Sequence, residues 1–282
     1  MGESTQAAVL KLRRPAVLTI AGFDPSSGAG ITADLAVFAA HNCFGLSAIT
    51  ALTVQSTVGV RRTQAIDAGL LADTLTCLDA DLPPAGIKIG MLADAPQVNV
   101  VAAYLRDLRQ RGRRVQVVLD PVLRSSSGKE LLTRAGLDGM LAQLLPMVDV
   151  ITPNTDELAV LTGMPSDTAQ QIESAMNTLA NRFGGMAVLA TGGHRSQPDD
   201  VLLHAGEISV LHGTRIETLA THGTGCALSS ALLCGLVLGK PLLEASALAK
   251  RYVEEAIRSA ESRGAGKGPM NLLWPISGHR SA

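Results

Sequence analysis

The segment Thr221–Cys226 carries the residues best suited to chemistry, because two glycines lead directly into a long apolar stretch with helical spacing. The backbone N–H groups of Gly223, Thr224 and Gly225 are expected to point at one place, where the positive end of a helix favours a phosphate group. The same helix end predicts a lowered pKa for the Cys226 thiol, which would then accept a proton from an alcohol as a general base. The alternative interpretation of Cys226 is a small buried thiol on a packed helix.

A second glycine-rich segment, Ala21–Gly30, leaves an apolar run and opens a helix that carries Asp34. Gly28 and Gly30 remove side chains, so the backbone can approach a small polar ligand closely, and the helix start offers unpaired N–H groups. The alternative is a turn from strand to helix that glycine merely makes easier.

Residues 28–33 also satisfy the loose GxGxxA form of a dinucleotide-binding turn, which would indicate a nicotinamide or flavin enzyme. Such a site needs an acidic residue at the end of the second strand to hold the ribose. That strand runs into Thr53-Val54-Gln55-Ser56-Thr57 without one, so the dehydrogenase interpretation loses most of its support. A P-loop is excluded as well, because no Gly-Lys pair in the sequence is followed by Ser or Thr.

These segments must be positioned by a regular framework, and the chain shows one. Short runs rich in Val, Ile and Leu alternate with longer amphipathic segments, which is typical of a mainly parallel sheet covered by helices. The predicted buried strands are residues 16–21, 46–53, 86–90, 115–119, 148–152 and 187–191. The predicted helices are residues 31–40, 70–78, 97–111, 137–145, 168–183, 227–238 and 242–262.

Residues 200–204 and 207–212 are separated by Ala205-Gly206 and predict an antiparallel hairpin at one edge of that sheet. The predicted fold is therefore an α/β, three-layer αβα sandwich with a mainly parallel central sheet. No linker or fixed repeat interrupts the pattern, so residues 15–274 are expected to form one domain. Residues 1–14 and 275–282 are expected to be a loosely held extension and tail.

Composition excludes several classes of protein. The 24 basic and 25 acidic residues give a net charge of -1, and aromatic residues make up only 2%, so nucleic acid is not an expected partner. The longest apolar stretch, residues 226–239, is too short to span a bilayer. Four cysteines without a CxxC pair are typical of reduced thiols in the cytoplasm. No zinc-ligand spacing is present, so any metal is expected to arrive with a substrate.

Six signatures in order resemble the hydroxymethylpyrimidine and phosphomethylpyrimidine kinases of thiamine synthesis, members of the ribokinase-like superfamily. The resemblance runs nearly end to end. In the Thr221–Cys226 loop most ribokinase relatives carry aspartate where this chain has cysteine. The signatures are residues 19–30, 49–57, 88–92, 120–122, 151–157 and 221–226.

The resemblance implies a substrate pocket in which Gln55 hydrogen-bonds the aminopyrimidine edge. A side-chain amide presents both a donor and an acceptor, which suits an amino group beside a ring nitrogen. The resemblance also implies ATP as co-substrate, Mg²⁺, a homodimer and a cytoplasmic location. The other implied site residues are Asp34, Gly22 and Met91 around the substrate, Asp120 and Glu157 for magnesium, and Asn154 and Thr191 for the nucleotide.

Three positions depart from the family pattern. Thr191 stands where many relatives have lysine, so a phosphate-facing cation is missing unless Lys267 or Lys129 replaces it. Phe23 replaces a common threonine and Ser27 replaces a glycine in the first motif, which affects pocket shape and therefore substrate choice.

The expected reaction is transfer of the ATP γ-phosphoryl group to the hydroxymethyl group of 4-amino-5-hydroxymethyl-2-methylpyrimidine, followed by a second transfer onto the phosphomethyl product. Alignment and charge stabilisation are expected to contribute more to the rate than deprotonation. One alternative is a pyridoxal or pyridoxine kinase, whose substrate is also a heteroaromatic ring with a hydroxymethyl group. An alternative of another class is a sensor that binds the pyrimidine without phosphorylating it.

Overall fold

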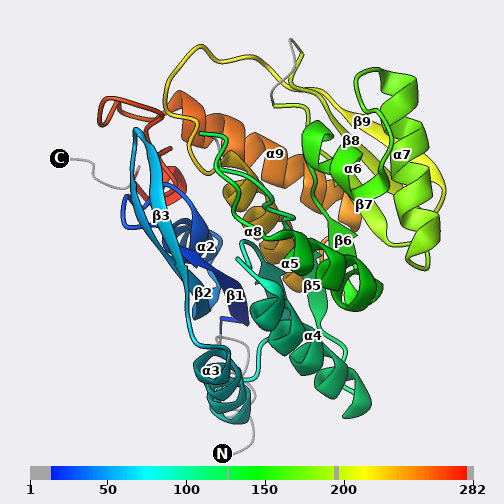
Figure 1. The fold of residues 1–282 in the computed structure, drawn as a ribbon. Coiled ribbons are helices and arrows are strands. Elements are labelled where there is room, and N and C mark those ends of the chain that lie inside the picture. The colour runs from blue at the N-terminus through cyan, green and yellow to red at the C-terminus, as the bar shows by residue number, and fades with distance from the viewer. Residues whose placement is uncertain (1–13, 126, 194–196, 278–282) are drawn as a thin grey trace, which may run out of the picture.

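The framework is a single nine-stranded sheet in a computed structural model that describes residues 14–125, 127–193 and 197–277 (Figure 1). The strands are β1 (Ala16–Phe23), β2 (Phe44–Ser56), β3 (Gly59–Ala65), β4 (Gly86–Ile89), β5 (Gln116–Leu119), β6 (Val150–Ile151), β7 (Ala187–Ala190), β8 (Asp200–His204) and β9 (Glu207–Leu211). Their order across the sheet is β3-β2-β1-β4-β5-β6-β7-β8-β9.

The six strands from β2 to β7 in that order are parallel, and the sheet ends in antiparallel pairs at both edges. The predicted mainly parallel sheet and the predicted hairpin, now β8 and β9, are both confirmed. The opposite edge was not predicted: β3 pairs antiparallel with β2, although Gly59–Ala65 contains mostly polar residues. A strand at an exposed edge buries little, so it lacks the apolar pattern by which the inner strands are recognised.

Helices cover both faces of the sheet, which gives the three predicted layers. On one face lie α2 (Gly30–Ala40), α8 (Thr224–Val237) and α9 (Leu242–Arg258), and on the other α3 (Ala68–Asp81), α4 (Ala95–Gln110), α5 (Arg134–Gly139), α6 (Thr155–Thr162) and α7 (Ala169–Arg182). Figure 1 shows α8 and α9 on the side of the sheet opposite α4 and α5. A short α10 (Trp274–Ser277) ends the described chain.

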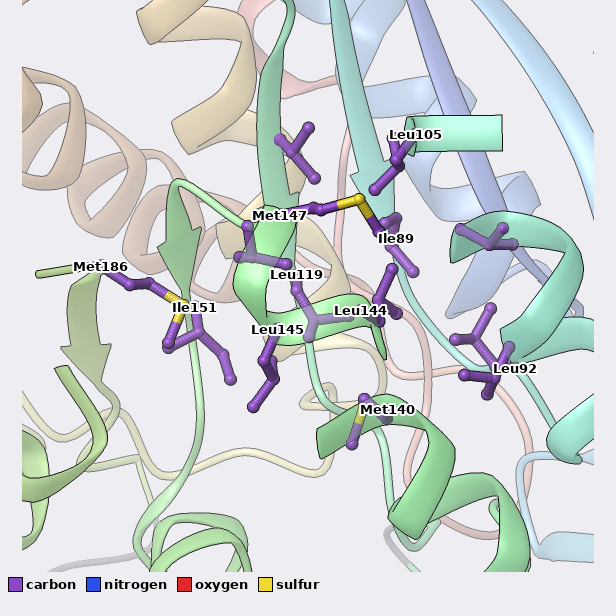
Figure 2. Close-up of a cluster of buried hydrophobic side chains, with 14 of the residues drawn as sticks. Ile89, Leu92, Leu105, Leu119, Met140, Leu144, Leu145, Met147, Ile151 and Met186 are labelled. Atoms are coloured by element: carbon purple, nitrogen blue, oxygen red, sulfur yellow. The ribbon is translucent and has the colours of Figure 1, made fainter. Parts of the chain in front are cut away.

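The alternation of side chains along the strands separates two hydrophobic cores. In β5, Val118 faces the core under α8 and α9, whereas Val117 and Leu119 face the core under α3 to α7. Figure 2 shows part of the second core, where Leu119 and Ile151 from the sheet lie among methionines and leucines. Inner strands such as β4 and β7 are buried on both sides, which explains their largely apolar sequences.

Several predicted boundaries differ from the structure. The predicted helix 137–145 is α5 followed by a turn of π-helix, Met140–Leu144, and a 3₁₀ turn, Leu145–Met147. The last predicted helix ends at Arg258 and not at residue 262, and α6 was not predicted. The predictions for residues 1–13 and 278–282 lie outside the described part of the chain.

The topology places a ligand crevice at one end of the sheet. Strand β1 lies between β2 and β4, so the connection that leaves β1 toward β2 and the one that leaves β4 toward β5 run in opposite directions, and the carboxyl ends of β1 and β4 meet at the point of reversal. In open parallel sheets, ligands bind at such a point. In the described residues, no helix has the length and apolar content needed to cross a bilayer.

Candidate active site

The two glycine-rich segments identified in the sequence lie against each other at this end of the sheet. Gly223 has a φ of +81°, and a Cβ built on it would lie 1.9 Å from the carbonyl oxygen of Gly28. A Cβ on Gly28 would in turn lie 2.2 Å from the His222 ring. Only glycine fits at both positions, so the close approach of the two backbones depends on them.

Helix α8 begins at this contact, one turn earlier than predicted. Gly223 is its N-cap in the left-handed region, and no side chain of the described residues caps it. The N–H groups of Thr224, Gly225 and Cys226 therefore find no carbonyl within the helix and no capping oxygen. This uncapped start, with the positive helix end behind it, has the geometry that the predicted anion-binding place requires.

The predicted lowering of the Cys226 pKa is wrong for the protein without ligands. Although the residue keeps some exposed surface, burial of its sulfur raises the pKa to about 12, and the nearby carboxylates of Asp120 and Asp34 act in the same direction. The positive charge of Lys88 and a hydrogen bond from the Gly30 amide oppose this increase but do not overcome it. Desolvation and negative charge outweigh the field of the helix.

Asp34, which was predicted to line the substrate pocket, is bound by groups of the protein itself. The residue is fully buried, and its carboxylate accepts hydrogen bonds from Lys88 Nζ at 2.9 and 3.0 Å, Thr19 Oγ1 at 2.6 Å and Ser230 Oγ at 2.8 Å. Four donor contacts use all the lone pairs that a carboxylate offers. Asp34 therefore joins β1, β4 and α8 beneath the site and positions other residues.

Gly22 and Met91 lie side by side at the carboxyl ends of β1 and β4. A Cβ on Gly22 would come within 2.8 Å of the Met91 sulfur, so the thioether fills the space that a side chain would occupy. The Met91 carbonyl accepts a hydrogen bond from Thr50 Oγ1 at 2.5 Å, which ties β2 to the same place. The two residues form a small apolar wall at the point where the connections between strands change direction.

Gln55 lies near the end of β2 and contacts the Thr221–Cys226 loop. Its amide is 2.9 Å from His222 Nε2, which is also 2.7 Å from the Asp24 carboxylate. Asp24 accepts further hydrogen bonds from Ser26 and from the backbone of Ala29, so it holds the first glycine loop in place. Burial opposes ionisation of Asp24, but the bonds from His222 and Ser26 prevail and lower its pKa.

Asp120 directly follows β5, Glu157 lies in the first turn of α6, and both are buried. Burial is the largest cause of the raised pKa of each, and the charge of Asp120 raises that of Glu157 further. A Cβ on Gly225 would lie 3.4 Å from Asp120, so this carboxylate sits directly under the start of α8.

A divalent cation fits these two acids. Two buried carboxylates with raised pKa values near an uncapped helix start could hold magnesium together with phosphates and water. Among the described residues, no three His, Cys, Asp or Glu side chains are grouped to hold a metal ion by themselves. The predicted cation would therefore depend on ligands that the nucleotide brings.

Asn154 and Thr191 are adjacent across the ends of β6 and β7, where they form an isolated parallel bridge. Asn154 is the N-cap of α6 and forms a capping box with Glu157. The lysines considered as replacements at position 191 differ in placement. Lys129 donates to the Arg61 carbonyl at 2.5 Å, whereas Lys267 is exposed and precedes Gly268, whose carbonyl accepts from the His222 amide.

Two side chains of this site received no predicted role. Lys88 is fully buried, and the carboxylate of Asp34 helps to raise its pKa against the effect of burial. The sequence signal for Lys88 is its position inside the apolar run of β4, because a buried lysine charge requires a buried partner of opposite charge. His222 is the other, and only its place in the glycine loop indicated proximity to a ligand.

The comparisons with known proteins agree with this geometry. The family model for phosphomethylpyrimidine kinase matches residues 24–271. A hydroxymethylpyrimidine/phosphomethylpyrimidine kinase of Rhizobium meliloti is 39% identical, over 90% of this chain and 95% of that protein. The thiamine biosynthesis bifunctional protein ThiED of Geobacter sulfurreducens is 37% identical over 96% of this chain, and the match spans 56% of its length.

Solved structures show the same architecture. A phosphomethylpyrimidine kinase from Clostridium difficile has a TM-score of 0.75 and 32% identity, covering 86% of this chain and 100% of that one. An ADP complex of Bacillus subtilis pyridoxal kinase has a TM-score of 0.81 and 28% identity, covering 92% and 97%. The fold and the site thus define a ribokinase-like phosphotransferase that acts on a small molecule. Within that class, the chain belongs to the phosphomethylpyrimidine kinase family.

The Glu157→Gln variant is expected to be more stable than the wild type at pH 8 in the absence of ligands. A carboxyl whose folded pKa is raised from 4.5 to about 8 loses stability as pH rises through that interval, because the folded state holds the proton more tightly. Glutamine keeps the capping-box hydrogen bond and removes only the charge. Denaturant unfolding should give a gain of about 1 kcal/mol or more at pH 8 and no gain at pH 4.

Addition of Mg²⁺ and ATP should make the wild type the more stable of the two, because its Glu157 carboxylate would bind the cation and the variant lacks that carboxylate. The exposed Glu173→Gln on α7 is the matched control and should follow the wild type throughout. An equal rise in Tm with Mg²⁺ and ATP in Glu157→Gln and the wild type would remove Glu157 from the metal site.

Proposed function

We propose that this chain phosphorylates 4-amino-5-hydroxymethyl-2-methylpyrimidine with ATP, first to the monophosphate and then to the diphosphate, in thiamine diphosphate biosynthesis. The observation that carries the proposal is the uncapped start of α8, which lies against the first glycine loop with Cys226 in its first turn. Phosphoryl transfer requires alignment and charge stabilisation above all, and this cradle supplies both. The match of residues 24–271 to the family supports the pyrimidine as substrate.

Each residue of the site would have a separate role in binding or catalysis. Gln55 pairs with the aminopyrimidine edge, and Gly22 and Met91 bound the ring. The amides of Gly223, Thr224 and Gly225 receive the transferred phosphoryl group, and Cys226 takes the proton of the attacking hydroxymethyl group. Asn154 and Thr191 contact the nucleotide from the neighbouring strand ends. Asp34 and Lys88 hold the floor of the site from below.

Asp120 and Glu157 would hold Mg²⁺ together with the phosphates of ATP. The ion would neutralise charge on the phosphate oxygens. The buried, raised-pKa state of both acids supports this role, because a bound cation offsets their repulsion.

A pyridoxal kinase is the second candidate, because pyridoxal kinases from Bacillus subtilis and Staphylococcus aureus share this fold at 25–28% identity. The relatives named as pyrimidine kinases are more similar, at 32–39% identity, which favours the first proposal.

One incubation separates the candidates. The purified chain is mixed with Mg²⁺, ATP and either the hydroxymethylpyrimidine or pyridoxal, and mass spectrometry counts the phosphates added. Two phosphates on the pyrimidine and faster turnover than with pyridoxal support the proposal. Binding of the pyrimidine by calorimetry without any product would identify a sensor, and preferred turnover of pyridoxal would identify the other kinase.

We further propose a cytoplasmic homodimer in which residues 15–274 act as one domain. The support for the dimer is a row of exposed apolar side chains near the sheet edge, Leu52, Val54 and Val58, which are 47%, 49% and 72% exposed. The support for the location is that the four cysteines are unpaired thiols. Light scattering on the purified chain should give twice its mass of 29.2 kDa.

A further inference from the structure

The contacts of His222 link the substrate-reading residue to the first glycine loop. His222 Nε2 lies 2.7 Å from Asp24 Oδ2 and 2.9 Å from the amide nitrogen of Gln55. The His222 side chain is only 12% exposed and that of Asp24 only 5%, so water does not compete freely for these positions. One nitrogen atom therefore faces two neighbours, and it cannot donate to one while accepting from the other.

The carboxylate decides which role Nε2 takes. The hydrogen bonds that Asp24 accepts lower its pKa, so it is ionised and can only accept. A short contact between Nε2 and an ionised carboxylate requires a hydrogen on Nε2, whether the imidazole is neutral or charged. With that hydrogen in place, Nε2 has no lone pair left for a donor from Gln55.

The Gln55 amide can accept a hydrogen bond from His222 Nε2–H in only one of its two orientations. If its NH₂ group faces His222, two donors meet at 2.9 Å. A half-turn of the amide brings the carbonyl oxygen to the same place, where it accepts from Nε2–H, and turns the NH₂ group toward the pocket. The hydrogen-bond network, and not the shape of the amide, distinguishes these orientations.

We propose that the Asp24–His222 pair locks the Gln55 amide with its carbonyl oxygen on His222, so that His222 is a positioning residue that sets substrate specificity. The inference rests on the proposed role of Gln55 in holding the pyrimidine. The locked amide offers an NH₂ donor and the second lone pair of its carbonyl oxygen. This pattern matches a ring-nitrogen acceptor beside an exocyclic amino donor, as in a 4-aminopyrimidine.

The same lock rejects the reversed pattern. A 4-oxo analogue of the substrate presents a carbonyl acceptor beside a ring N–H donor, so each of its groups meets a group of the same kind on the locked amide. A site built around buried hydrogen bonds discriminates strongly against such a mismatch. Once the lock is removed, Gln55 can turn over and pair with the 4-oxo ring.

The test compares kcat/KM for the 4-amino substrate and the 4-oxo analogue in two variants. His222→Phe keeps a ring against Gly28 and removes the donor, whereas His222→Gln keeps a donor that Asp24 can orient. We expect the ratio of amino to oxo kcat/KM to fall about tenfold or more in His222→Phe, with an absolute gain for the oxo analogue, and to be mostly retained in His222→Gln. A general structural defect would lower kcat/KM for both substrates together. An unchanged ratio of amino to oxo kcat/KM in His222→Phe would overturn the proposal.

A second measurement does not depend on turnover or on the folding of a variant. Long-range ¹H–¹⁵N correlation spectra of the wild-type chain report which imidazole nitrogen of His222 carries a hydrogen. Hydrogen on Nε2 supports the lock, and a neutral ring with hydrogen only on Nδ1 overturns it. If the wild type phosphorylates neither pyrimidine, the proposed function fails while this spectrum still decides the orientation of Gln55.

Discussion

Cys226→Ala is expected to lower kcat by about a hundredfold or more and to leave KM for both substrates nearly unchanged. The sulfur lies in the first turn of α8 beside Asp120, and in the proposed reaction it accepts the proton of the attacking hydroxyl group. Because the pKa of Cys226 is about 12 in the absence of ligands, only a small fraction of the thiol is ionised at neutral pH. The wild-type kcat/KM, which reports the ionisation of the free enzyme, should therefore rise with pH between 7 and 9, and this rise should be absent from Cys226→Ala.

Two further variants make this result specific. Cys226→Asp introduces the acidic residue of most ribokinase relatives and should recover part of the lost rate. The exposed Cys77→Ala is the control for cysteine replacement and should behave as the wild type. Wild-type turnover in Cys226→Ala would exclude the thiol from proton transfer and leave the amide cradle as the main source of rate.

Gly223→Ala is expected to reduce kcat/KM by at least a hundredfold, the usual cost of losing a backbone donor in an anion hole. The new methyl group would lie 1.9 Å from the Gly28 carbonyl oxygen, so the two loops must separate. The amides of the first turn of α8 then lose their alignment with the phosphoryl group. A fall in the free energy of unfolding should accompany the loss of activity, because a residue with a side chain is strained at a φ of +81°.

Gly239→Ala is the control that separates the effect of backbone strain from the effect of pushing the two glycine loops apart. Gly239 follows the other end of α8 with a φ of +83°, but a Cβ there meets nothing within 4 Å. Denaturant unfolding should show a loss of about 1 kcal/mol from backbone strain in Gly239→Ala and a larger loss in Gly223→Ala, where the two loops are also displaced, and only Gly223→Ala should lose catalysis. Equal kcat/KM values in the two alanine variants would show that the contact of the glycine loops does not matter for the reaction.

The fold was largely predictable because the inner strands are buried on both faces. Runs such as those of β1 and β5 must be apolar throughout, and their spacing with helical segments specifies a parallel sheet. Helix α6 was missed because it has only eight residues. Asn154 and Glu157 stand three residues apart in the capping-box pattern, so the signal for its start was present in the sequence.

The site was less predictable because its electrostatics depend on burial. Spacing identified Cys226 at a helix start, but the opposite sign of its pKa shift follows from desolvation and from Asp120 and Asp34, which only the fold brings near. Asp34 was assigned to the ligand from the resemblance alone. Its saturation by Lys88, Thr19 and Ser230 involves residues from three separate elements, and no local pattern encodes such a convergence.

Two hydrogen bonds of the site join residues from the first and the last quarter of the chain, so the site cannot form until most of the chain has been synthesised. The bond between Asp34 and Ser230 spans 196 residues, and that between Asp24 and His222 spans 198. At ribosomal rates, about 10 to 40 s pass between the appearance of the first and the last partner. A growing polypeptide therefore has no phosphate cradle until α8 has emerged, and ribosome-bound fragments that end before α8 should neither bind nor hydrolyse ATP.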